Sequence, residues 1–124
     1  MNKLIYKDES YKIIGICMEV HNILGKGHNE VIYKDALEHE FSNNNFPYSR
    51  EKIYIIKYKD IILPHHYFAD FVVFDKIILE VKAIESLTNS HIKQTLNYIA
   101  TSKLKLGLLV NFGEDSLNYK RVVL

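Results

Sequence analysis

The spacing of apolar residues along the chain predicts three helices. The predicted helices span residues 11–24, 29–42 and 89–102. In each, apolar side chains recur every three or four positions, which is the period of an amphipathic helix. Gly25 and Gly27 follow the first helix, and glycine readily takes the left-handed conformation that ends a helix. Asn29 is the expected cap of the second helix, and Thr88 or Asn89 that of the third.

Segments rich in β-branched and aromatic residues predict the strands. They span residues 51–59, 61–74, 77–83 and 104–110, with a last edge strand over 119–123. Pro64 cannot donate to a strand ladder, so it marks an edge, a bulge or the start of the better strand, His66 to Phe74. The run from Leu104 to Val110 is almost wholly apolar, which is typical of a strand covered on both faces.

The order of these elements, ααβββαβ(β), predicts an α/β fold. Three antiparallel strands precede a helical crossover into a buried strand, so the expected architecture is a mixed central sheet flanked by helices. A chain of 124 residues fits one domain of ordinary size, here residues 1–124.

Composition restricts the location and the class of partner. No stretch approaches the ~18 to 20 apolar residues of a membrane helix, so no membrane partner and a cytoplasmic location are expected. The formal charge of +1 gives no global electrostatic argument for nucleic acid, although a local basic surface stays open. The single cysteine, Cys17, excludes an intramolecular disulfide and lies on an apolar stripe, which predicts a buried thiol.

The candidate chemistry lies on two neighbouring strands. Glu80 and Lys82 project from the same face of the third strand, because side chains alternate along a strand. Whether Asp70 shares that face depends on the connection between the strands. A three-residue connection, residues 74–76, or an equivalent bulge sets Asp70 opposite Glu80, whereas a two-residue connection opposes Asp70 to Val81. We predict the longer connection.

Two facing carboxylates on an apolar sheet call for a cation between them. Oxygen ligands of this kind suit Mg²⁺ or Mn²⁺, and Lys82 beside them would place its ammonium near a phosphate or an attacking water. The alternative is a salt bridge between Asp70 and Lys82, with Glu80 solvated. The apolar residues that surround the trio on both strands favour the metal site.

The flanking helices carry further candidates. Glu30 lies on the side of the second helix that is expected to face the sheet, although an acid in a first turn is also favoured by the helix dipole. On the third helix a polar stripe borders the apolar seam, and it suits either a nucleic-acid backbone or an ordinary boundary. The stripe consists of His91, Gln94, Tyr98 and Ser102.

Several of these residues form motifs in a fixed order. The motifs are Gly27-x-x-Glu30-x-x-Tyr33, Asp70, Glu80-Val81-Lys82 and Gln94-x-x-x-Tyr98. Together they resemble the GxxExxY family of the PD-(D/E)XK nuclease-like superfamily, over residues 14–123. The proline common between the two glycines of that family is Lys26 here.

The resemblance implies a restriction-endonuclease-like core and a role for each matched residue. Asp70 and Glu80 would bind one or two divalent ions, with the Val81 carbonyl as a third ligand. Glu30 would complete the metal shell, directly or through water. Lys82 would orient the attacking water or help to deprotonate it.

The remaining motif residues are the expected substrate contacts. The resemblance implies that Gln94 and Tyr98 position the substrate backbone, and Tyr33 is assigned to the same group.

The leading hypothesis is therefore a nuclease that uses Mg²⁺ or Mn²⁺ to hydrolyse DNA or RNA. The alternative is a non-catalytic module of the same fold that binds nucleic acid or a protein partner, which the small size and near-neutral charge favour. Hydrolysis of a small phosphodiester is a third option. A homodimer that brings two sites to two strands is compatible with this size.

Overall fold

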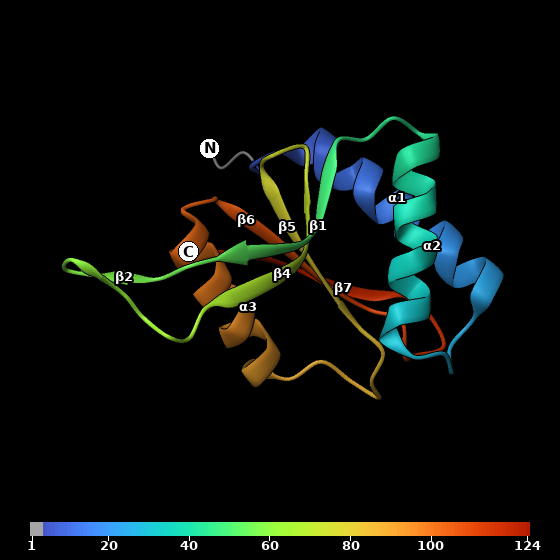
Figure 1. Ribbon diagram of the computed structural model, residues 1–124. Helices are drawn as coiled ribbons and strands as arrows, with labels where there is room; N and C mark the ends of the chain where they lie inside the picture. The colour runs from blue at the N-terminus through green and yellow to red at the C-terminus, as the bar shows by residue number, and fades with distance from the viewer. Residues whose placement is uncertain (1–3) are drawn as a thin grey trace.

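The computed structural model describes residues 4–124, which form a central sheet between helices (Figure 1). The elements are α1 (Lys7–Leu24), α2 (Glu30–Asn43), β1 (Tyr48–Tyr54), β2 (Lys57–Tyr58), β3 (Ile61–Ile62), β4 (Tyr67–Val73), β5 (Ile77–Lys82), α3 (Asn89–Ser102), β6 (Leu106–Asn111) and β7 (Asn118–Val123). Five strands form the sheet in the order β1-β4-β5-β6-β7, and β2 and β3 pair separately. The predicted α/β class and mixed sheet are confirmed.

One parallel pair makes the sheet mixed. β5 and β6 run parallel, with Glu80 beside Leu109 and Lys82 beside Asn111, and α3 is the crossover between them. The other neighbouring strands pair antiparallel. β6 is buried along its whole length, as its apolar sequence predicts.

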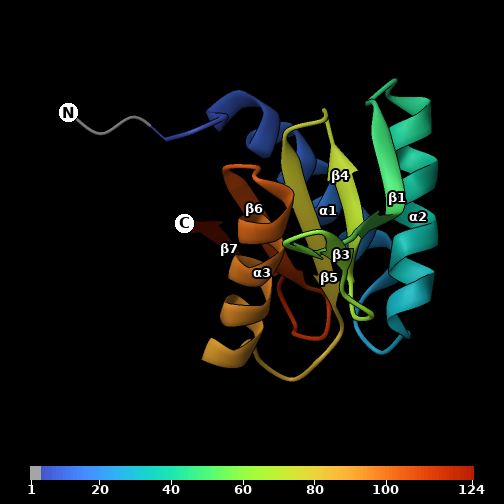
Figure 2. The same cartoon turned by 60° about the vertical axis from the view of Figure 1, so that its left-hand side comes forward.

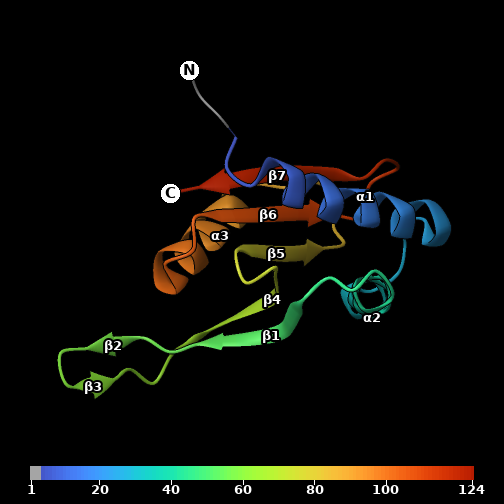
Figure 3. The same ribbon diagram turned by 90° about the horizontal axis from the view of Figure 1, so that it is seen from above.

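The helices cover opposite faces of the sheet and give it two apolar cores. Figure 3 shows α1 and α2 on one face and α3 on the other. The core beneath α1 and α2 includes Ile13, Cys17, Val20, Tyr33, Leu37, Phe41, Phe71, Leu79, Val81, Leu108 and Phe112. The core beneath α3 consists of Ala69, Val72, Ile78, Tyr98, Ile99, Leu109 and Val122. Cys17 is fully buried, as predicted.

The helix ends follow local chemistry. Gly25, at φ 69°, ends α1 and donates its N–H to the His21 carbonyl at 2.8 Å. α3 spans the predicted residues, and Thr88 caps it through a capping box with His91. α1 starts at Lys7, four residues before its predicted start. The prediction missed this first turn because its residues are polar and show no apolar period. Asp8 and Glu9 in that turn are favoured by the helix dipole.

The predicted strand over residues 51–59 is wrong as one element. β1 starts earlier, at Tyr48, and ends at Tyr54, after which the chain leaves the main sheet to form the β2–β3 hairpin. The segment 61–74 is divided in the same way between β3 and β4, with Pro64 between them. Composition favours extended backbone throughout but does not say which strand each segment pairs with. The hairpin stands away from the sheet in Figure 3.

A buried amide joins the ends of β5 and β6. The Asn111 side chain is fully buried and spans the two chain segments that follow these strands. Its Oδ1 accepts hydrogen bonds from the N–H groups of Ile84 (3.0 Å) and Gly113 (3.1 Å), and its Nδ2 donates to the Ile84 carbonyl at 2.9 Å. Residues 84 and 113 are thereby held so close that a Cβ at Gly113 would overlap the Ile84 backbone.

We expect Gly113→Ala to lower the free energy of unfolding by about 2–3 kcal/mol, because the backbone of Ile84 cannot yield as a flexible side chain would. Gly15→Ala is the matched control. Gly15 lies within α1 with no atom within 4 Å of its added Cβ, so the change should raise stability by about 0.5–1 kcal/mol. Urea unfolding of both variants measures this difference, and equal effects would contradict the close approach at Gly113.

Candidate functional site

The turn between β4 and β5 decides whether the two acids meet. Three residues, Phe74 to Lys76, connect the strands, and the first two have positive φ values of 59° and 56°. β4 and β5 pair through Phe71 and Leu79, and the same register continued by one position places Asp70 opposite Glu80. The three-residue connection predicted from the sequence is the one that the structure has.

The two carboxylates replace the backbone ladder at this point. Glu80 Oε2 accepts a hydrogen bond from the Asp70 backbone N–H at 2.7 Å. Asp70 Oδ2 accepts one from the Val81 backbone N–H at 2.8 Å. Each acid is therefore held by the backbone of the opposite strand, and the two side chains converge where regular pairing stops.

A change in side-chain alternation accompanies this exchange. Ala69 and Val72 are three residues apart in β4, yet both belong to the core beneath α3, whereas Phe71 belongs to the other core. Strict alternation would put Ala69 and Val72 on opposite faces. The interruption falls at Asp70, which allows its carboxylate to reach the N–H of the neighbouring strand.

Glu80 is buried in a setting that disfavours its charge. Its side chain is only 3% exposed. Burial, followed by the negative charge of Asp70, raises the pKa of Glu80 to about 8, while the Asp70 N–H and the positive charges of Lys82 and Lys34 act in the opposite direction. A cation at this point would therefore relieve an electrostatic cost that is built into the site.

Lys34 of α2 is the residue at this site that the sequence analysis missed. Its Nζ lies 3.3 Å from Asp70 Oδ1 and 2.7 Å from Glu51 Oε1, and its side chain is largely buried. Burial opposes its charge, but the hydrogen bond with Glu51 and the charge of Asp70 outweigh it and raise the pKa of Lys34. The available signal was spacing, since Lys34 follows Glu30 by four residues and so shares its side of the helix.

The alternative salt bridge between Asp70 and Lys82 is wrong for the residues that the structure describes. Lys34 is the cation paired with Asp70, and Glu80 is buried rather than solvated. Lys82 is partly buried and its backbone carbonyl accepts the Phe112 N–H at 2.8 Å. The positive charge of Lys82 lowers the pKa of Glu80, so its ammonium lies near the acidic pair.

Glu30 is not brought to the acidic pair. It is the first residue of α2 and is partly exposed. Within residues 4–124, three or more acidic, histidine or cysteine side chains do not converge in a metal-binding cluster. The structure thus assembles Asp70, Glu80 and Lys34 directly and leaves Glu30 outside this group.

The predicted substrate contacts occupy different environments. Gln94 is exposed on α3, whereas Tyr98 is nearly buried and its ring meets that of Tyr67 edge to face, with centroids 5.1 Å apart. Burial, with the charges of Glu80 and Asp70, raises the pKa of Tyr98 to about 12, which indicates that its hydroxyl lies near the acidic pair.

Tyr33 is fully buried, which favours a positioning role over the substrate contact predicted for it. Its hydroxyl donates to the Gly25 carbonyl at 2.6 Å and accepts the His28 N–H at 3.2 Å. Its ring stacks on Phe112 with centroids 4.5 Å apart. Tyr33 thereby fixes the turn that leads into α2, the helix that carries Glu30 and Lys34.

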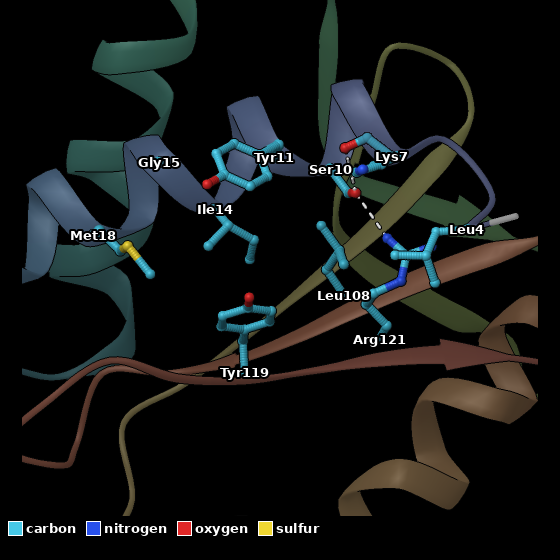
Figure 4. A pocket seen from close by; sticks show the side chains of 10 residues that line it. All are labelled: Leu4, Lys7, Ser10, Tyr11, Ile14, Gly15, Met18, Leu108, Tyr119 and Arg121. Atoms are coloured by element: carbon cyan, nitrogen blue, oxygen red, sulfur yellow. Dashed lines mark hydrogen bonds between the residues drawn. The ribbon is translucent and has the colours of Figure 1, made fainter.

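A pocket of about 270 Å³ lies elsewhere, between α1 and the strands β6 and β7 (Figure 4). Apolar residues and tyrosines make up most of its wall, and Arg121 at its edge donates to Ser10 Oγ at 2.7 Å. Its wall contains no acidic, histidine or cysteine side chain among residues 4–124, so it has no ligands for a hard cation.

Comparison with known proteins identifies the fold that carries this acidic pair. The family model described as the PD-(D/E)XK nuclease superfamily matches residues 7–122 of the chain. The chain belongs to the PD-(D/E)XK nuclease superfamily. No curated protein and no solved structure gives a significant match.

The acidic pair of this PD-(D/E)XK protein fits a divalent cation. PD-(D/E)XK nucleases generally use divalent metals. Here two carboxylates lie together, one of them buried at the cost of a raised pKa, and both offer the hard oxygen ligands that Mg²⁺ and Mn²⁺ prefer. Lys34 of α2 supplies a positive charge next to Asp70.

We expect Glu80→Gln to change the pH dependence of stability. The folded protein keeps a proton on Glu80 up to about pH 8, whereas the unfolded chain releases it near the ordinary value of 4.5. The free energy of unfolding of the native sequence therefore falls as the pH rises between these values. The glutamine does not titrate, so at roughly pH 9 the variant should be more stable by on the order of a few kcal/mol.

Urea unfolding in a chelator at several pH values measures this effect. Glu19→Gln, an exposed acid on α1, is the control and should leave the pH profile of the native protein unchanged. Parallel profiles for the native protein and Glu80→Gln would show that folding does not raise the pKa of Glu80.

Proposed function

We propose that this protein is a nuclease that depends on Mg²⁺ or Mn²⁺ and hydrolyses phosphodiester bonds of DNA or RNA. The observation that carries the proposal is the convergence of Asp70 and buried Glu80 at the open end of the β4–β5 pair, with Lys82 beside them. Membership of the nuclease superfamily supports the same class of reaction and a nucleic-acid substrate.

Each residue has a distinct role in the proposal. Asp70 and Glu80 would hold the cation, with the Val81 carbonyl as a further ligand. Glu30 lies outside the acidic pair, so its part in the metal shell through water stays a prediction. A divalent cation at this point would stabilise the charge that develops on the attacking and leaving oxygens. Lys82 orients the attacking water and stabilises the phosphoryl oxygen. The products carry a 5′ phosphate and a 3′ hydroxyl.

The substrate is held from the α3 side. Gln94 is exposed and donates hydrogen bonds to the phosphate backbone, while Tyr98 borders the acidic pair from the same helix. Tyr33 acts indirectly, by positioning the start of α2. No helix within residues 4–124 is long and apolar enough to cross a membrane. The cytoplasmic location and the homodimer stay predictions.

A non-catalytic module is the second candidate, and the Lys34–Asp70 contact is the observation that favours it. With Nζ 3.3 Å from Asp70, Lys34 already offsets part of the negative charge without a metal. A descendant of a nuclease that only binds nucleic acid or a protein would retain the fold in this way. Metal binding separates the two candidates.

The cleavage test compares Asp70→Ala, Glu80→Ala and Lys82→Ala with the native protein. The substrates are labelled single-stranded, double-stranded and branched DNA and RNA, with Mg²⁺ or Mn²⁺. We expect each substitution to slow cleavage at least about 100-fold, because each removes a charge that the reaction needs. Glu19→Gln on the remote surface of α1 should cleave as the native protein does.

Calorimetric titration with Mg²⁺ and Mn²⁺ completes this test. Metal binding that is lost in Asp70→Ala and Glu80→Ala supports the nuclease. Cleavage that persists in those two purified variants would refute the assignment. Nucleic-acid binding without any metal binding would leave the module as the function.

We expect Lys34→Gln to tighten metal binding. The ammonium beside Asp70 repels an incoming cation, so its removal should lower the dissociation constant for Mn²⁺ roughly 10-fold. Arg50→Gln is the matched control, because Arg50 is a partly buried cation of β1 that pairs with Asp35 and Glu38 of α2 instead of with Asp70. Calorimetry should show no change for that variant, and weaker binding in Lys34→Gln would mean that Lys34 supports the metal site.

A further inference from the structure

The β2–β3 hairpin exposes large apolar side chains outside both cores. We define the hairpin arm as residues 52–66, the outer end of β1 together with the hairpin. Five of its apolar side chains are exposed, by 47% at Ile53 and Ile55 and by 52–59% at Tyr58, Ile61 and Ile62. A two-stranded hairpin with unburied apolar residues is marginally stable in water, so such a surface indicates an interaction site.

The hairpin arm also concentrates basic charge. It contains three exposed lysines, Lys52, Lys57 and Lys59, and one acid, Asp60, whereas the entire chain has a formal charge of only +1. The described ion pairs of the chain involve none of these three lysines. Lys59 Nζ lies 5.5 Å from the centroid of the exposed Tyr58 ring, so positive charge and an aromatic face are presented together.

The hairpin arm lies on the side of the sheet that carries α3. Figures 2 and 3 both show it leaving the sheet on that face, opposite to α1 and α2. The chain passes from the arm directly into β4, which carries Asp70, and Tyr67 at the start of β4 contacts Tyr98 of α3. A nucleic-acid strand that lies over the acidic pair would therefore run between α3 and the arm.

The chemistry of the arm fits nucleic acid better than a protein surface. Lysine is depleted in protein–protein interfaces, where desolvating a flexible ammonium is costly. Lysines outside the described ion pairs, in β1, β2 and the turn after β2, suit phosphates, which release counterions when they are neutralised. Exposed Tyr58 and the exposed aliphatic side chains of β3, Ile61 and Ile62, suit the faces of bases that are unstacked or unpaired.

We propose that the hairpin arm is a surface that binds the nucleic-acid strand cleaved at the acidic pair. Lys57 and Lys59 contact its phosphates, and Tyr58, Ile61 and Ile62 contact its bases. The choice of ligand rests on the proposed nuclease function, but the surface and its residues do not depend on catalysis.

The test measures binding without cleavage. A fluorescent DNA or RNA oligonucleotide of about 20 nucleotides, single-stranded or paired, is titrated with the protein in a chelator at several salt concentrations. We expect the double variant K57E/K59E to bind at least about tenfold more weakly, with the salt dependence reduced by a slope of about 1.5, because two phosphate contacts are lost. The matched control K7E/K12E reverses two exposed lysines of α1 and should bind within about twofold of the native protein.

A second variant tests the apolar contacts. I61S/I62S should weaken binding about three- to tenfold without changing the salt slope, because no charge is altered. Melting temperatures of all variants should stay within about 2 °C of the native value, since the substituted side chains are exposed.

The outcomes separate the arm from the nuclease. Binding that depends on the arm, with no cleavage when metal is added, supports the arm and refutes the nuclease. Cleavage with equal binding by the native protein and K57E/K59E refutes the arm and leaves the nuclease standing. Absence of oligonucleotide binding by the native protein refutes the arm. If sedimentation shows that I61S/I62S converts a dimer into monomers while each protomer binds the oligonucleotide unchanged, the arm is a self-association surface and the proposal is wrong.

Discussion

The exchange of hydrogen bonds between Asp70 and Glu80 is the constraint on which the site depends. Each carboxylate accepts a backbone N–H of the opposite strand, so neither acid can move without breaking a hydrogen bond that joins β4 to β5. On its other side β5 is held by the continuous parallel ladder with buried β6. The carboxylates are therefore fixed before any cation arrives, which reduces the entropy that binding must overcome.

Around this exchange, charge is distributed unequally between the two acids. Glu80 is buried beneath α3 with a raised pKa, whereas Asp70 has Lys34 as a direct cationic neighbour. Among residues 4–124, Asp70 is therefore in an ion pair, whereas Glu80 is in none, although the charge of Lys82 lowers its pKa. A divalent ion between them would replace the proton of Glu80 and compete with the ammonium of Lys34, so the affinity for such an ion would depend on both exchanges.

Much of this arrangement could be predicted from the sequence, because it depends on whether the turn between two neighbouring strands has an odd or an even number of residues. The length of the turn between β4 and β5 determines which residues oppose each other, and a three-residue connection is sufficient to set Asp70 against Glu80. The helix periods likewise predicted α2 and α3 closely. The class of fold followed from the order of the elements.

The errors arose where the answer depends on distant partners. The predicted strand over residues 51–59 is divided at Tyr54 because β1 pairs with β4 only up to that residue. Composition does not reveal where such pairing ends. Lys34 and Glu30 lie on one side of α2, and only the packing of that helix decides that the lysine reaches Asp70. Tyr33 matches a motif position, yet its hydroxyl donates a hydrogen bond to the Gly25 carbonyl, which no spacing rule reveals.

The hairpin arm differs from the rest of the chain in how freely its length can change. Its tip, Lys59-Asp60, is connected to the sheet only through β1 and β4, and it contributes to neither core. Insertions or deletions at the tip would leave the register of Asp70 and Glu80 intact, because loop closure costs little per added residue. Relatives with the same acidic pair are thus free to diverge in reach and in ligand preference by lengthening or shortening one turn.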